Sequence, residues 1–352
     1  MKSVRVYAIG AALLIIATVA AVWWTTTSPR AISVSTPIVQ QDAYWTALIK
    51  LKGGETAYTE FAWFVQRLSP EEQHQEAHIF GGALYEAQGL SGLSICDAQF
   101  AFGCFHEFLG RAIAALGLSV VQQLDENCFK VLGPEKGLAC EHGIGHGIEV
   151  SIGYSADDLR KTLATCKTLS HNEPIGGCYA GAFMEYDLQT MLGTQGRVRE
   201  ISGNDMQFPC DAVSVEYKKS CYFSQPQWWY QRFRADGLSD VKNIYMQTGA
   251  LCAQVPDAYA RDCYEGIGTN IPAAVRFSPD LSRGVCESVS SDPADVLYCK
   301  SLAANAIFSA EGNNTHATDV CAGLTEKAYA YCDSYARNQA NILNEAVLPA
   351  TL

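Results

Sequence analysis

The chain has 352 residues, of which 48% are hydrophobic and 14 are cysteine, and its formal net charge is −12. The hydrophobic content excludes a generally disordered chain, and the length allows two ordinary domains or one repeat array. The acidic balance argues against nucleic acid as a partner, because DNA and RNA are polyanions.

An apolar run lies close to the N-terminus. Residues 6–24, "VYAIGAALLIIATVAAVWW", carry no charge and are long enough to span a bilayer. Because Lys2 and Arg5 precede the run, residues 1–5 are predicted to be cytoplasmic and the remainder extracytoplasmic, as in a single-pass protein of the cell membrane. The alternative is a signal peptide, and cleavage of residues 1–21 would release a secreted protein.

The next segments lead into helices. Residues 25–40 are rich in Ser and Thr with two prolines, which predicts a linker. Residues 41–90 are predicted to form N-terminal helices, two of them separated by the glycine pair at 53–54. A further helix is predicted after Ser69, because Ser69 and Glu72 have the spacing of a capping box.

The cysteines indicate an oxidising compartment. Their number is even and no CxxC motif occurs, so the pattern predicts disulfides and excludes the usual zinc ribbons, thioredoxin-like sites and covalent haem. No dinucleotide fingerprint is present, which excludes NAD as an expected cofactor. Taken two at a time in chain order, the cysteines are Cys96 and Cys104, Cys128 and Cys140, Cys166 and Cys178, Cys210 and Cys221, Cys252 and Cys263, Cys286 and Cys299, and Cys321 and Cys332.

The order of these pairs is periodic. The first members recur at steps of 32 to 44 residues, a period typical of stacked supersecondary units. Helix caps and breaks inside the units, such as Ser155 before "ADDLRKTLATC", predict helical hairpins. We therefore expect an all-α fold in which residues 91–345 form an α-solenoid of about seven hairpins, following an N-terminal transmembrane or signal helix. A disulfide within each hairpin is the simplest connectivity, and other pairings stay open.

Paired cysteines within helical hairpins at this period resemble the disulfide-stapled Sel1-like repeats of secreted, cysteine-rich bacterial proteins. The resemblance covers residues 90–340, although the "A..WY.KAA" ending of Sel1 repeats is not reproduced. It implies architecture alone. Proteins of this kind are similar to tetratricopeptide scaffolds, which bind partners on a concave face.

Histidines occupy equivalent positions in the early units. His106 and His142 each stand two residues after the second cysteine of a pair, and His146 follows His142 by one helical turn in the stretch "CEHGIGHGIE". His78, followed by Gly82, repeats the spacing in the preceding helix. The later units carry other residues at the position of His106 and His142, namely Ala180, Phe223, Glu265, Ser301 and Ser334.

This register predicts a metal site. Equivalent positions of neighbouring helices lie side by side, so His78, His106, His142 and His146 are the expected ligands. Imidazole ligands favour copper or zinc, with iron less favoured. Glu185 lies in a similar register to His146 and is the candidate catalytic acid or base, with Glu107 and Glu141 as further carboxylates nearby.

An alternative to the metal site is a structural role for the same residues. The glycines around the histidines could mark a crowded helix seam, in which the histidines only make hydrogen bonds and the array is a scaffold that binds a protein or glycan. His74 is predicted to lie on the solvent side of its helix, and His171 and His316 are predicted to be exposed.

Overall fold

The computed structural model describes residues 32–337 apart from 98, 172, 174, 195, 201–204 and 312–315. Every regular element in these residues is a helix and none is a strand, so the all-α prediction is confirmed. The apolar run at residues 6–24 lies outside the described residues. Inside them, no single helix is long and apolar enough to span a membrane; residues 99–116 and 118–134 meet that test only as a pair bent by 118°.

Among the described residues, three α-helices precede the first disulfide: α2 (Ile38–Lys52), α3 (Gly54–Val65) and α4 (Pro70–Gln88). The first begins at Ile38, within the predicted linker, directly after Pro37. Gly53, with φ 84°, separates α2 from α3, in agreement with the predicted break. Both hydrogen bonds of the capping box between Ser69 and Glu72 are present at the start of α4.

Seven disulfides join consecutive cysteines, with Cα–Cα distances from 5.4 Å to 5.9 Å. Of the connectivities that the sequence left open, the structure has the one in which each cysteine bonds its neighbour in the chain. The pairs are Cys96 with Cys104, Cys128 with Cys140, Cys166 with Cys178, Cys210 with Cys221, Cys252 with Cys263, Cys286 with Cys299, and Cys321 with Cys332.

In four of these disulfides both cysteines belong to α-helices, as the hairpin prediction requires. Cys128 and Cys140 both lie in α6 (Val121–Ile152), which bends between them at Gly133. Each of the remaining disulfides among these four joins two separate helices. They join α7 (Ala156–Cys166) with α8 (Cys178–Leu188), α10 (Val241–Cys252) with α11 (Asp257–Ala274), and α12 (Pro279–Val289) with α13 (Pro293–Glu311).

The other three units depart from a simple hairpin, because their first cysteine is not in an α-helix. Cys96 follows the 3₁₀ helix η1 (Gly89–Ile95), Cys210 lies in a turn, and Cys321 ends the 3₁₀ helix η5 (Ala317–Cys321). Glycine or proline in or beside the first two of these segments disfavours a long helix there; examples are Gly89, Gly92 and Pro209.

The second cysteines of these three units do belong to α-helices. Cys104 lies in α5 (Gly103–Leu116), and Cys332 lies in α14 (Glu326–Arg337). Cys221 lies in α9 (Lys218–Ala235), which follows η4 (Val215–Tyr217). All seven second cysteines therefore lie in α-helices, whereas the secondary structure around the first cysteine differs from unit to unit.

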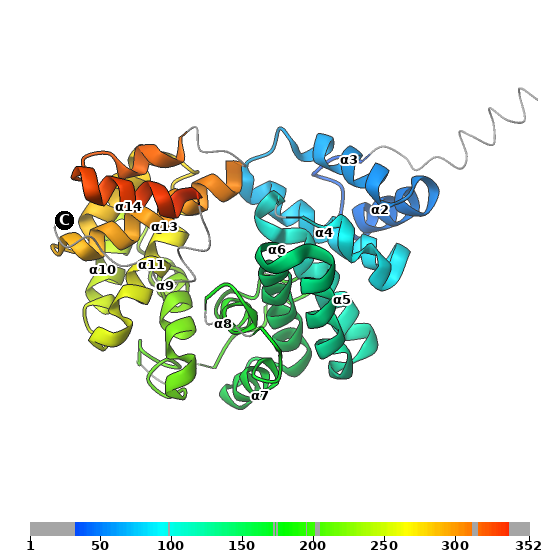
Figure 1. Cartoon of the computed structure of the whole chain (residues 1–352), viewed down its shortest axis with the longest axis horizontal. Helices are drawn as coiled ribbons and strands as arrows, with labels where there is room; N and C mark the ends of the chain where they lie inside the picture. The colour runs from blue at the N-terminus through cyan, green and yellow to red at the C-terminus, as the bar shows by residue number, and fades with distance from the viewer. Residues whose placement is uncertain are drawn as a thin grey trace, which may run out of the picture.

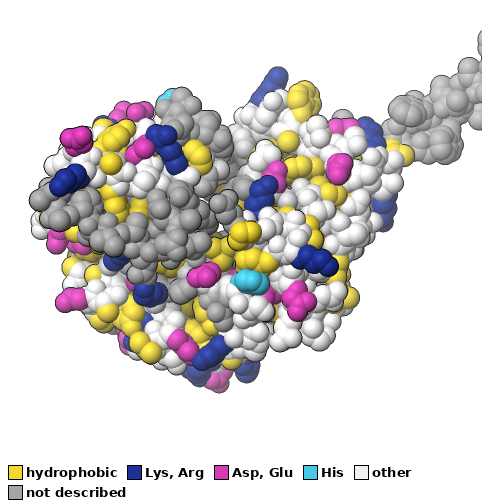
Figure 2. Space-filling view, in the orientation of Figure 1, with side chains coloured by type: hydrophobic (Ala, Val, Ile, Leu, Met, Phe, Trp, Pro, Cys, Tyr) yellow, Lys and Arg dark blue, Asp and Glu magenta, His cyan; other side chains and the backbone are white. Residues whose placement is uncertain are grey.

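α4 and the helices that carry the second cysteines pack side by side in chain order. Contacts run from α4 to α5, α6, α8, α9, α11, α13 and α14. Figure 1 shows the resulting arc from the blue to the red end of the chain. α13 also contacts η2 (Gln99–Phe102), so the two ends of the arc meet. Lys and Arg side chains are interspersed with Asp and Glu on the face drawn in Figure 2, and little histidine surface reaches that face.

Candidate metal centre

Five histidines from three adjacent helices lie together. His74 and His78 are one turn apart on α4, His106 is on α5, and His142 and His146 are one turn apart on α6. His78, His106 and His146 are buried, with exposed fractions of 2%, 4% and 0%, whereas His74 and His142 are partly buried. The cluster therefore has a buried middle and a partly exposed residue in each of its outer pairs.

Close approach of the helix backbones brings these side chains together. A Cβ atom on Gly81 of α4 would lie 2.1 Å from the carbonyl oxygen of Cys104 on α5. One on Gly147 of α6 would lie 3.1 Å from Cα of Gly110 on α5. Within "CEHGIGHGIE" the closest approach is at Gly145, where a Cβ would lie 2.1 Å from the carbonyl oxygen of Cys178 on α8, so glycine is required there.

The first set of converging nitrogens comes from His74, His78 and His106. Nε2 of His78 lies 3.2 Å from Nε2 of His74 and 3.3 Å from Nδ1 of His106. All three ligand atoms lie within 4.8 Å of one another. The prediction that His74 faces solvent is wrong, because one helical turn places it on the same face of α4 as His78.

The second set is made by His106, His142 and His146. Nε2 of His142 and Nε2 of His146 are 3.1 Å apart, and the ring of His106 lies 4.5 Å from the ring of His146 between centroids. The ligand atoms of this set also lie within 4.8 Å of one another. Three of the four histidines predicted from the sequence thus form this set, and the fourth, His78, belongs to the first.

The nitrogen spacings suit a metal ion. Zinc–imidazole bonds are about 2.0–2.1 Å long, so two imidazole nitrogens on one tetrahedral ion are about 3.3 Å apart. The observed spacings of 3.1 to 3.3 Å are close to that edge. Two spacings in the first set and the His142–His146 spacing in the second are of this size, and the other ligand atoms of each set lie within 4.8 Å, so both sets could hold a transition metal ion.

Glu185 orients His146 from the side away from the cluster. The ring of His146 donates from Nδ1 to Oε2 of Glu185 at 3.1 Å, which leaves Nε2 facing His142. Glu185 is completely buried and accepts hydrogen bonds from the hydroxyl of Tyr154 and the backbone N–H groups of Thr190 and Met191. A carboxylate behind a ligating histidine fixes its tautomer and raises its basicity.

Glu107 has a similar place behind His78. Its Oε2 lies 4.0 Å from Nδ1 of His78 and accepts a hydrogen bond from the backbone N–H of Leu192, while Arg111 donates to its Oε1. The segment after α8 therefore holds both carboxylates, one through Thr190 and Met191 and the other through Leu192. No sequence pattern pointed to this segment or to Tyr154.

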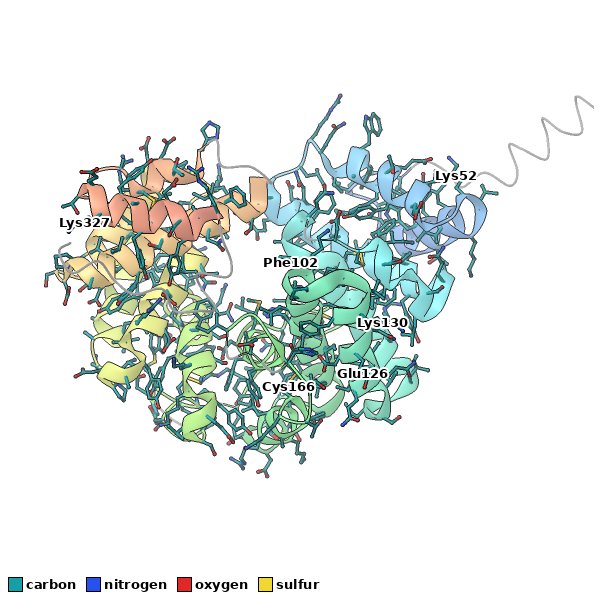
Figure 3. The ribbon with its side chains drawn as sticks, in the orientation of Figure 1. Lys52, Phe102, Glu126, Lys130, Cys166 and Lys327 are labelled. Atoms are coloured by element: carbon teal, nitrogen blue, oxygen red, sulfur yellow. A yellow bond between two sulfur atoms is a disulfide. The ribbon has the colours of Figure 1, made fainter. Side chains whose placement is uncertain are left out.

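The ring of His74 is fixed by a backbone carbonyl. Its Nδ1 donates to the carbonyl oxygen of Phe100 at 2.8 Å, so Nε2 carries the lone pair that faces His78. Phe100, Ala101 and Phe102 all have positive φ, a conformation that is costly for residues other than glycine. Figure 3 labels Phe102 in this turn, next to the helices that carry the histidines.

Electrostatics keep four of the imidazoles in the form that binds metal. Burial lowers the pKa of His78, His106 and His142 well below 6.5, and the neighbouring histidines lower it further. Burial also lowers the pKa of His74. These rings are therefore neutral at neutral pH, with lone pairs free for coordination.

The remaining candidates lie elsewhere. Glu141 is buried beside Asp125 and belongs to neither histidine set; burial, and then the charge of Asp125, raises its pKa to about 9. The side chain of His171 is 45% exposed and its ring stacks on Phe129, and His316 is exposed, so these two predictions are confirmed.

Comparisons with known proteins add no assignment. No family model, curated protein or solved structure matches this chain. The histidine cluster and its carboxylates therefore carry the functional argument alone.

Proposed function

We propose that this chain is a membrane-anchored, extracytoplasmic metal-binding protein, in which an α-solenoid of disulfide-linked helical units holds a transition metal ion. His106, His142 and His146 are the ligands, and Glu185 is a positioning residue for His146. The observation that carries the proposal is the convergence of three imidazoles within 4.8 Å, one of them backed by a fully buried carboxylate.

The ligand type selects the metal class. An all-imidazole set suits copper(II) or zinc and lacks the oxygen ligands that magnesium and calcium prefer. All cysteines in the described residues form disulfides, so no thiolate competes for the ion there. Seven disulfides also indicate a compartment outside the cytosol, where copper(II) persists.

The position of Glu185 favours orientation over proton transfer. Both of its carboxylate oxygens accept hydrogen bonds from the protein, and no part of the side chain reaches solvent. A group so enclosed does not meet a substrate directly. Any catalysis would depend on a ligand position of the metal that the three histidines leave open.

Metal analysis of the purified full-length chain tests the proposal. After loading with copper(II) or zinc, the wild type should retain stoichiometric metal through gel filtration, and the His142→Ala, His146→Ala double variant should lose the ion of this set. His171→Ala is the matched control, because His171 is outside the cluster, and it should retain the wild-type amount. A folded wild type with intact disulfides and no bound metal would overturn the proposal and leave a scaffold for a protein or glycan.

The anchor is tested separately. Residues 6–24 are proposed to cross the membrane, with residues 25–352 outside the cytoplasm. Protease added to intact spheroplasts or cells should therefore degrade a C-terminal tag while the N-terminus stays membrane-bound. A chain released into the medium without residues 1–21 would show a cleaved signal peptide instead.

A further inference from the structure

The two histidine sets share one residue. His106 belongs both to the set with His74 and His78 and to the set with His142 and His146. It is on α5, between the helices that carry the two outer pairs. Its ring has two nitrogens, and each nitrogen can coordinate one ion.

Within the described residues His106, like His78 and His142, makes no hydrogen bond to a carbonyl or carboxylate, in contrast to His74 and His146. Nδ1 of His74 donates to a backbone carbonyl, and Nδ1 of His146 donates to Glu185. His106 is 4% exposed, and within the described residues its hydrogen-bond contact is with Nε2 of His78, a histidine. No carbonyl or carboxylate there reserves either ring nitrogen of His106 for an outer contact.

We infer that the cluster is a two-ion centre in which His106 bridges the ions as an imidazolate. This inference rests on the proposed function and extends it from one ion to two. His74 and His78 complete one site, and His142 and His146 complete the other. Both ring nitrogens of His106 must coordinate for this, so the second ion displaces the remaining N–H proton, which leaves to solvent.

The two sites have related surroundings, although only Glu185 makes a hydrogen bond to its histidine. Each site has a carboxylate behind one of its histidines, Glu107 for His78 at 4.0 Å and Glu185 for His146 at 3.1 Å. In their anionic forms these carboxylates, together with the imidazolate, would offset part of the charge of two divalent cations in a buried place. Each site also has one partly exposed histidine, His74 or His142.

The inference specifies the ions as well as their number. Imidazolate is a strong nitrogen donor that copper(II) and zinc accept, and two ions on opposite nitrogens of one ring lie about 6 Å apart, from bonds of about 2 Å each. Two copper(II) ions at that separation are magnetically coupled through the ring. The coupling gives a readout that does not depend on any enzymatic activity.

A copper(II) titration of the purified full-length chain tests the inference. The wild type should bind two ions per chain, and its low-temperature electron paramagnetic resonance signal should grow to the first equivalent and fall with the second. His74→Ala and His142→Ala should each halve the bound copper and give an uncoupled signal. His106→Ala should abolish the coupling, and His171→Ala should behave as the wild type.

The outcomes separate the two proposals. Saturation at one ion per chain, or two ions with additive uncoupled signals, would overturn the bridge and leave the metal-binding function standing. No bound copper in folded protein would overturn both. If His106→Ala fails to fold, the paired results for His74→Ala and His142→Ala still decide the question, because each removes a ligand of only one site.

Discussion

The first half of the array, from α4 to α8, and the second half, from α9 to α14, are built by the same close helix contacts. A Cβ on Gly145 of α6 would lie 2.1 Å from the carbonyl oxygen of Cys178, and one on Gly268 of α11 would lie 2.2 Å from that of Cys299. Both glycines stand five residues after the second cysteine of their unit. Backbone packing is therefore repeated along the chain.

The side chains between those contacts differ. Two residues after the second cysteine, the first half has His106 and His142, whereas α11 has Glu265. The carboxylate of Glu265 is buried and accepts a hydrogen bond from Arg261 at 2.8 Å, and that guanidinium lies over the ring of Tyr298. The same helix packing thus encloses a histidine cluster in one half and an ion pair in the other. The type of buried polar side chain therefore varies independently of the backbone packing.

Alanine at the equivalent glycines should have the largest effect. We expect Gly145→Ala and Gly268→Ala each to lower the free energy of unfolding by about 2 to 4 kcal/mol, since the new Cβ would overlap a backbone carbonyl. Gly145→Ala should also weaken metal binding, because it pushes α6 away from α8, which carries Glu185. Urea denaturation and metal titration measure the two effects.

Gly284→Ala on α12 is the control for this pair. A Cβ there meets nothing within 4 Å, so the substitution should leave stability unchanged or raise it by about 0.5 to 1 kcal/mol through helix propensity. Equal losses of stability at Gly284 and Gly268 would contradict the close-contact explanation. Metal loss in Gly268→Ala would contradict the separation of the two halves.

Neutralising one buried carboxylate in each half should have a smaller effect, on metal affinity in the first half and on stability in the second. Glu185→Gln should weaken metal binding by about 10- to 100-fold, because a ligating histidine loses its anionic partner. Glu265→Gln should leave metal affinity at the wild-type value and lower stability only, because Glu265 is paired with Arg261. Isothermal titration calorimetry with zinc distinguishes them, and equal affinities for Glu185→Gln and wild type would remove the positioning role.

Within any one pH unit, the smallest expected effect is the change of stability with pH. Burial and Asp125 raise the pKa of Glu141 to about 9 from 4.5, so between these values the folded chain holds a proton that the unfolded chain has lost. The contribution is complete below pH 4.5, and stability falls as pH rises, by up to about 1.4 kcal/mol per pH unit from this group. Glu141→Gln should flatten that slope in metal-free protein.

The position in the second half that is equivalent to Glu141 provides a control. Tyr264 also directly follows a second cysteine, Cys263, just as Glu141 follows Cys140. Burial, and then Asp295, raises the pKa of Tyr264 to about 12, so it stays neutral over the same range. Tyr264→Phe should therefore leave the slope between pH 6 and 8 as in the wild type. Denaturation curves at several pH values in chelator measure both variants, and an unchanged slope in Glu141→Gln would refute the assignment.

Much of the local structure could be predicted from the sequence. The capping box at Ser69 and the break at Gly53 depend on neighbouring residues alone, and both occur as expected. The histidine register was also visible, because cysteines at fixed spacing align the units. The spacing of His74 to His78 equals that of His142 to His146, so the sequence does contain a signal that His74 shares the buried face of its helix.

Tertiary structure alone decided the rest of the site. The amides of Thr190 and Leu192, the hydroxyl of Tyr154 and the carbonyl of Phe100 reach the cluster or its carboxylates from segments with no shared period. Almost every residue has the same backbone N–H and carbonyl groups, so a pattern of residue types does not predict which of them reach the site. Whether His106 serves one set or both likewise depended on the distances between three helices.

The sequence by itself determined the helical class, the periodic cysteines and the histidines that could meet, because these follow from composition and spacing. Only the folded chain decided that five histidines converge, that Glu107 and Glu185 stand behind two of them, and that Glu141 does not. The physical reason is distance: ligand geometry is set to fractions of an ångström by helix packing, and packing depends on contacts between residues far apart in the chain.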